Sequence, residues 1–94
     1  MKLSEFNIED NLFRTITVNW VDIVTSGGWI DKDKMEAEHK APDVCLTIGF
    51  LSHWGKIRDT EYIVISSSHS TNNPDQYNQH IVIPYGCIID INTV

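Results

Sequence analysis

Thr15-Ile16-Thr17-Val18-Asn19-Trp20-Val21 is the stretch that decides the fold class, because apolar and polar side chains alternate along it. Ile16, Val18 and Trp20 would share one face of an extended chain, and the polar residues between them would share the other. Alternation with a period of two is typical of a half-buried strand in an antiparallel sheet. The strand is predicted to halt at Thr25-Ser26-Gly27-Gly28, where two glycines permit a sharp turn.

Four further strands are predicted in the second half of the chain, each a short apolar run bounded by turn residues. They cover residues 44–51, 62–66, 80–83 and 87–91. No amphipathic helix of the kind that a parallel crossover needs separates them. The sequence therefore predicts a mainly β fold, a small antiparallel five-stranded barrel, whose closure would remove exposed strand edges.

The segments between these strands are predicted to be irregular. Residues 1–12 indicate a short N-terminal helix or arm, and the charged residues 31–40 a solvated loop or a single helical turn. Residues 52–61 are predicted to form a connection of about ten residues, and residues 67–79 an exposed polar loop. On the last strand, Cys87, Ile89 and Ile91 are expected to face the same side.

Length and charge limit the functions open to the chain. Ninety-four residues describe one domain, residues 1–94, because two halves would each fall below about 50 residues. The formal charge of −6 disfavours generic binding to nucleic acid or anionic lipid. No apolar run approaches the roughly 18 residues that span a bilayer, and residues 1–5 lack the start of a signal peptide, so we expect a cytosolic protein without a membrane partner.

The second half of the chain resembles the Sm-like small barrel. The resemblance rests on a glycine-bearing strand, an apolar strand and a polar loop, followed by Ile83-Pro84-Tyr85-Gly86-Cys87-Ile88 running into the last strand. It covers about residues 44–94 and implies a barrel whose last two strands are joined by a short turn containing glycine. The basic stretch with which Sm-like proteins hold RNA is absent, and the acidic residues 31–40 argue against RNA binding.

Most of the chain also resembles small phage and prophage proteins of uncharacterised function. The matching residues are Val18-Asn19-Trp20-Val21-Asp22, Gly27-Gly28-Trp29, residues 45–51 and residues 81–86. This resemblance implies a viral accessory protein acting in the cytoplasm of the host cell. It brings no catalytic residues with it.

Metal binding and catalysis are not predicted. The candidate ligands are His39, Cys45, His53, His69, His80 and Cys87. They form neither Cys-x-x-Cys nor His-x-x-x-His, so we expect no metal and no cofactor, and the cysteines are expected to be small buried side chains. Ser66-Ser67-Ser68-His69, with Asp75 or Asp90, lacks a Gly-x-Ser-x-Gly frame, so we expect no enzyme.

Nucleotide binding is the stronger hypothesis. Aromatic rings that stack on a base, together with hydroxyl and amide groups that bind phosphate or ribose, can hold a nucleotide without a basic groove. The candidate ligand-binding residues are Gly28, Trp29, Trp54, Ser67, Ser68 and His69. The alternative for each tryptophan is a packing role, with Trp29 capping the barrel.

These observations lead to one expectation and two alternatives. We expect a non-enzymatic phage anti-defence protein, a homo-oligomer formed through strand edges or apolar faces, that sequesters a host nucleotide-derived immune signal. The first alternative is an inhibitor or adaptor that binds a host defence protein directly, through the acidic residues 31–38. The second is a minor component of the virion.

Overall fold

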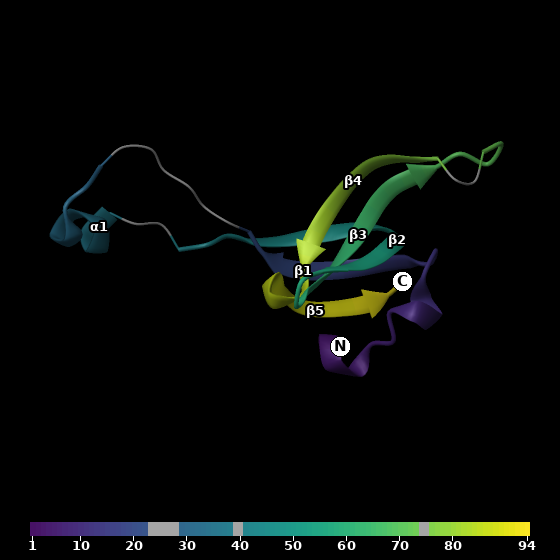
Figure 1. Ribbon diagram of the computed structural model, residues 1–94, viewed down its shortest axis with the longest axis horizontal. Coiled ribbons are helices and arrows are strands. Elements are labelled where there is room, and N and C mark those ends of the chain that lie inside the picture. The colour runs from purple at the N-terminus through teal and green to yellow at the C-terminus, as the bar shows by residue number, and fades with distance from the viewer. Residues whose placement is uncertain (23–28, 39–40, 74–75) are drawn as a thin grey trace.

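The computed structural model describes residues 1–22, 29–38, 41–73 and 76–94. The strands are β1 Thr15–Val21, β2 Val44–Ile57, β3 Thr60–His69, β4 Tyr77–Pro84 and β5 Ile88–Thr93. The helical elements are α1 Lys32–Glu38 and three 3-10 turns, η1 Leu3–Glu5, η2 Glu9–Asn11 and η3 Tyr85–Cys87. The strands form one antiparallel sheet in the order β4-β3-β2-β1-β5 (Figure 1). The mainly β, five-stranded antiparallel prediction is confirmed, whereas the sheet is not closed within the chain.

The core lies on one face of this bent sheet, where the alternating apolar residues of all five strands meet. Ile16 and Val18 of β1 are fully buried, as their alternation predicts. Trp20 packs beside them, and its Nε1 donates a hydrogen bond to Thr47 Oγ1 at 2.8 Å. The buried core consists of Ile8, Ile16, Val18, Leu51, Ile63, Ile65, Ile83 and Ile91. Leu3, Phe6 and Leu12 of the N-terminal segment pack against this core.

The predicted connection at residues 52–61 is wrong, because β2 and β3 form a hairpin through most of this segment. β2 continues to Ile57, and β3 begins at Thr60 after a turn in which Arg58 has a φ of 54°. The pairing shifts between Leu51 and His53, so Ser52 is an extra residue in a bulge. Because of this bulge, Trp54 lies on the same face as Leu51 although it is three positions further along the chain. The extra residue breaks the alternation of apolar and polar residues by which a strand is found in a sequence.

A second bulge makes the predicted faces of the last strand wrong. Opposite β1, Asp90 pairs with Asn19 but Ile88 pairs with Trp20, so Ile89 is the extra residue. Ile88 therefore packs against the core together with the buried Ile91, while Ile89 is exposed. Cys87 does pack on the core, but it and Cys45 are half-buried rather than fully buried.

Two further predicted segments differ in extent from the observed ones. The charged segment forms α1, a seven-residue helix rather than a single turn. β3 runs on to His69 and β4 starts at Tyr77, so the polar loop is shorter than residues 67–79. Serine and histidine have little strand propensity, but here they pair with β4, because Ser68 stands opposite Asn78 and His69 opposite Tyr77.

α1 belongs to an arm, described at residues 22, 29–38 and 41–43, and it lies well away from the sheet (Figure 1). The arm leaves the sheet as a continuation of the β1–β2 ladder, with Asp22 N donating to Asp43 O at 2.8 Å. The molecule measures 54 × 29 × 28 Å and its radius of gyration is 16.3 Å. A compact chain of this length would have a radius of gyration of about 12 Å. The arm accounts for this difference.

β3 pairs with β2 as far as Ser66 opposite Phe50, next to Gly49, and then rises away from β2 together with β4 (Figure 1). A Cβ atom at Gly49 would lie 2.6 Å from the carbonyl oxygen of Ser66 and 2.7 Å from Cγ2 of Ile65. Ser66 is itself fixed there, because its hydroxyl hydrogen-bonds with that of Ser52 at 2.8 Å. Only glycine fits this approach without displacing backbone.

We predict that Gly49→Ala lowers the free energy of unfolding by roughly 1–3 kcal/mol, because the added methyl group meets backbone that cannot yield. Urea denaturation followed by circular dichroism measures the loss. Gly86→Ala is the matched control, since a Cβ at Gly86 meets nothing within 4 Å. Equal free energies of unfolding for the two variants would show that β2 and β3 leave room for a methyl group at position 49.

Candidate functional site

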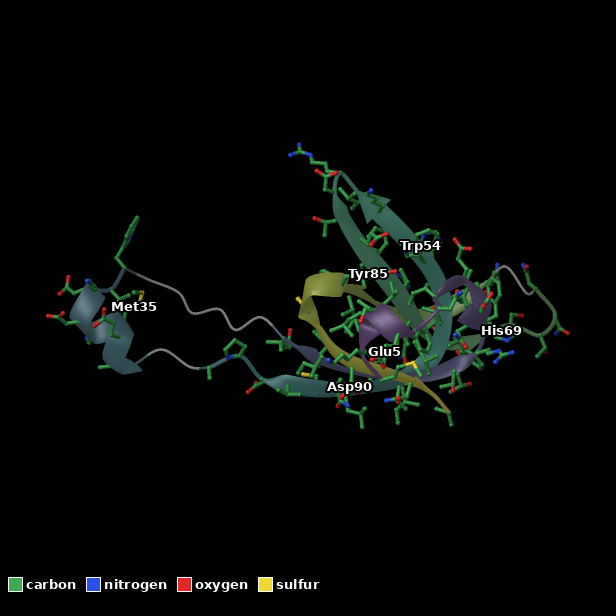
Figure 2. All side chains as sticks on the ribbon, turned by 90° about the horizontal axis from the view of Figure 1, so that it is seen from below. Glu5, Met35, Trp54, His69, Tyr85 and Asp90 are labelled. Atoms are coloured by element: carbon green, nitrogen blue, oxygen red, sulfur yellow. The ribbon has the colours of Figure 1, made fainter. Side chains whose placement is uncertain are left out.

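The candidate site residues do not form one site within a single chain. Trp29 lies on the arm, Trp54 in β2, and Ser67, Ser68 and His69 at the end of β3. Figure 2 shows Met35 on the arm, well apart from Trp54 and His69 on the sheet. Gly28 lies outside the described residues. The structure therefore brings together only Ser67, Ser68 and His69, and a shared role for both tryptophans stays a prediction.

Trp29 does not cap a core, because its side chain is fully exposed. With Ile30, Asp31 and Lys34 it lines a shallow depression on the arm. The packing alternative for Trp29 is thus wrong within one chain. A fully exposed indole is uncommon on a soluble domain and is typical of surfaces that bind something.

Trp54 packs against the core from β2, opposite Ile63. Its Nε1 atom is buried and has no hydrogen-bond partner among the described residues. An unpaired buried donor of this kind costs about 1–3 kcal/mol. The packing alternative therefore describes Trp54 better than an exposed stacking platform does.

A hollow of about 330 Å³ lies between the ends of β3 and β4. Its lining residues are Ser68, His69, Ser70, Gln76, Tyr77 and Asn78. The lining combines two rings with hydroxyl and amide groups, and none of these six residues is an acid or a lysine or arginine. Its volume is at the lower end of the range of small-molecule sites, about 300–1,000 Å³.

His69, which lines this hollow, contacts two aromatic rings. Its ring centroid lies 5.2 Å from that of Phe50, at an interplanar angle of 73°, and 5.9 Å from that of Tyr77, at 51°. His69 Nδ1 donates to the carbonyl oxygen of Ser70 at 3.3 Å.

The loop at residues 70–76 is closed by its own hydrogen bonds. Ser70 N donates to Gln76 O at 2.9 Å, and Asn73 N donates to Ser70 Oγ at 3.0 Å. Ser67 Oγ donates to the carbonyl oxygen of Asn78 at 3.1 Å. Ser67 therefore fixes β4 against β3, while Ser68 and His69 line the hollow itself.

Sequence reasoning missed residues that lie around His69, both in the lining of the hollow and behind it. Phe50, Tyr77 and Asn78 belong to two other strands, and only the strand register places them beside His69. The one signal in the sequence is Tyr77, the single large apolar residue in an otherwise polar stretch. Its half-buried ring against His69 explains why it is there.

Tyr85 carries a shifted pKa at a different place, in η3. Burial raises the pKa of its phenol above the ordinary value of 10.0, and the nearby carboxylate of Glu61 raises it further. Both causes favour the neutral phenol in the folded state. Tyr85 packs against the core, so this shift belongs to the stability of the fold rather than to the hollow.

The comparisons with known proteins do not assign this chain to a family. No family model, no curated protein and no solved structure matches the chain. Among the described residues, no group of three or more His, Cys, Asp or Glu side chains is placed to hold a metal ion. None of the helices in the described ranges has the length and apolar character to cross a membrane. The site must therefore be interpreted from its own chemistry.

We predict that the free energy of unfolding falls as the pH rises above 10 toward the raised pKa of Tyr85, because the unfolded phenol ionises first. Urea denaturation between about pH 8 and 11 measures the slope. Tyr85→Phe should remove this contribution to the slope, and Glu61→Gln should reduce it only in part, since burial is the larger cause. An unchanged slope in Tyr85→Phe would contradict the assignment.

Proposed function

We propose that this protein is a non-enzymatic phage accessory protein that binds and sequesters a host nucleotide-derived immune signal. The hollow at the β3–β4 end is the observation that carries the proposal, because aromatic rings and polar side chains meet there. Those are the groups that hold a base and its phosphates in the absence of a basic groove. The attribution to a phage rests on the sequence resemblance alone.

The residues of the hollow divide into two roles under this proposal. The rings of Tyr77 and His69 stack on a base, and the exposed position of His69 leaves its ring accessible. Ser68, Gln76 and Asn78 donate to phosphate or ribose oxygens. A protein that sequesters a signal needs affinity without turnover, and this lining supplies binding groups on one side of a ligand.

The proposal includes a homo-oligomer with an Sm-like small-barrel fold. Two features support that fold: five antiparallel strands in one sheet, and a short 3-10 turn with Gly86 between the last two strands, as the resemblance implies. Oligomerisation supports tight binding, because a shallow hollow on one chain encloses a ligand only when a second chain adds a wall. In such an oligomer, the arm of one copy could place Trp29 beside the hollow of another copy.

Native mass spectrometry of protein purified from cells that produce nucleotide immune signals tests the proposal. We predict an oligomer carrying a reproducible extra mass in the range of a nucleotide. Cyclic dinucleotides and ADP-ribose-type nucleotides, added at saturating concentration to the purified protein, are the defined probes. Absence of added mass with every probe would reject sequestration, and co-purification of a stoichiometric host protein instead would identify the inhibitor alternative.

Replacing the His69 ring is predicted to weaken binding of a retained nucleotide, because this ring lines the hollow and lies beside the ring of Tyr77. His69→Gln should lower the affinity about tenfold. His80→Gln is the matched control, since His80 is exposed on the neighbouring β4 but does not line the hollow. Isothermal titration calorimetry measures both variants, and equal effects would remove His69 from the site.

A further inference from the structure

Among the residues that the structure describes, the first half of β2 has a neighbouring strand on one side only. β1 pairs with β2 from Val44 to Phe50, but β3 pairs with it only from Phe50 onward. Asp22 N donates to Asp43 O, and Leu51 N donates to Arg14 O, so the odd-numbered residues of this half are bonded to β1. The backbone N–H and C=O groups of the even-numbered Val44, Leu46 and Ile48 therefore point away from β1. A row of unpaired groups like this is a template for another strand.

The side chains along this free edge are also exposed and apolar. Val44, Leu46 and Ile48 share the face opposite the core and are 65%, 61% and 60% exposed. Residues 44–50 read Val-Cys-Leu-Thr-Ile-Gly-Phe, with no charge and no proline. Sequences of this composition favour pairing between chains. Edges that stay solvent-exposed usually carry lysine, proline or a bulge, and this one carries none of them.

The two outer edges of the sheet are protected by comparison. Along β5, Ile91 N donates to Met1 O at 2.9 Å, and the Met1 amino group donates to Asn92 Oδ1 at 2.8 Å. The N-terminal segment thus covers that edge. In β4, Gln79 has a φ of 45° and the last residue is Pro84. The edge at residues 44–48 is the most apolar of the three in sequence.

We propose that residues 44–48 pair antiparallel with the same residues of a second copy, about a two-fold axis through Leu46. Leu46 then stands opposite Leu46 of the second copy, and Val44 opposite Ile48. Each pair exchanges two backbone hydrogen bonds, because the backbone groups of these even-numbered residues face the free side. The apolar pattern is symmetric about Leu46, so an identical copy is its complement. The two Asp43 carboxylates end up about 20 Å apart, so like charges do not meet.

This pairing gives the proposed ligand site its second wall. In the same register, the residues before Val44 of one copy lead toward the Phe50 end of the other copy's β2, where Ser66 stands opposite Phe50 and the Phe50 ring contacts His69. The arm that carries Trp29 begins at that point, so each arm starts next to the hollow of the partner copy rather than its own. This consequence rests on the proposed function, whereas the pairing itself does not depend on any ligand.

A lysine at the centre of the edge tests the interface. In size-exclusion chromatography with light scattering, we predict a dimer or a larger assembly built from dimers for the unmodified protein, and loss of that dimer contact in Leu46→Lys. Leu46 is already exposed, so the variant should keep its circular dichroism spectrum. Ile57→Lys and Val82→Lys are the matched controls, because both side chains are exposed but lie at the hairpin tip and on β4. Both controls should assemble as the unmodified protein does.

Cysteine pairing tests the register in a Cys45→Ser, Cys87→Ser background. Leu46→Cys should form an intermolecular disulfide on oxidation, because directly opposed residues have Cα atoms about 5.5 Å apart. Val44→Cys alone should not, since Val44 of one copy stands four residues from Val44 of the other. The double variant Val44→Cys, Ile48→Cys should form it again.

A monomeric unmodified protein would overturn the inference, and so would a dimer that Leu46→Lys leaves intact. Dissociation caused by Val82→Lys instead would move the interface to β4. These assays use ligand-free protein, so a dimer that afterwards binds none of the added nucleotide probes would uphold the pairing and reject the sequestration proposal. Binding of a probe by a monomer would do the reverse.

Discussion

The close approach of β3 to β2 at Gly49 is the contact on which the rest of the structure depends. The carbonyl of Ser66 and the side chain of Ile65 occupy the space that a side chain at position 49 would need. This contact lets the sheet bend, so that Leu51 and Ile65 are buried in one core. It also ends the β2–β3 pairing. The same bend therefore leaves residues 44–48 without a second neighbour and carries Ser68 and His69 out to form the hollow with β4.

Alternation along the sequence predicted the sheet well wherever the pairing is regular. Ile16 and Val18 are buried as expected, and the antiparallel strands lie near their predicted places. The errors fall at the bulges, because one extra residue at Ser52 or Ile89 shifts the period and reverses the apparent faces. Nothing in a single sequence marks these positions, since the pairing partner decides where the extra residue goes.

The candidate site was only partly predictable for a related reason. Ser68 and His69 stand out as polar residues next to an apolar strand, and they do line the hollow. Phe50 and Tyr77 join them through strand register, which a linear reading does not contain. Trp54 illustrates the opposite case, because it was placed in a loop and is instead packed against the core. Residue type alone does not separate a ring that stacks on a ligand from one that fills a core.

Net charge and association are compatible in this molecule because the charge lies away from the apolar edge. The formal charge of −6 would make two copies repel each other if acids met at their contact. Residues 44–50 carry no charge, and several of the acids lie on α1 and in the N-terminal segment. Charges separated by more than about 8 Å are largely screened at physiological salt. The same argument applies to the hollow, since none of its six described lining residues carries a carboxylate.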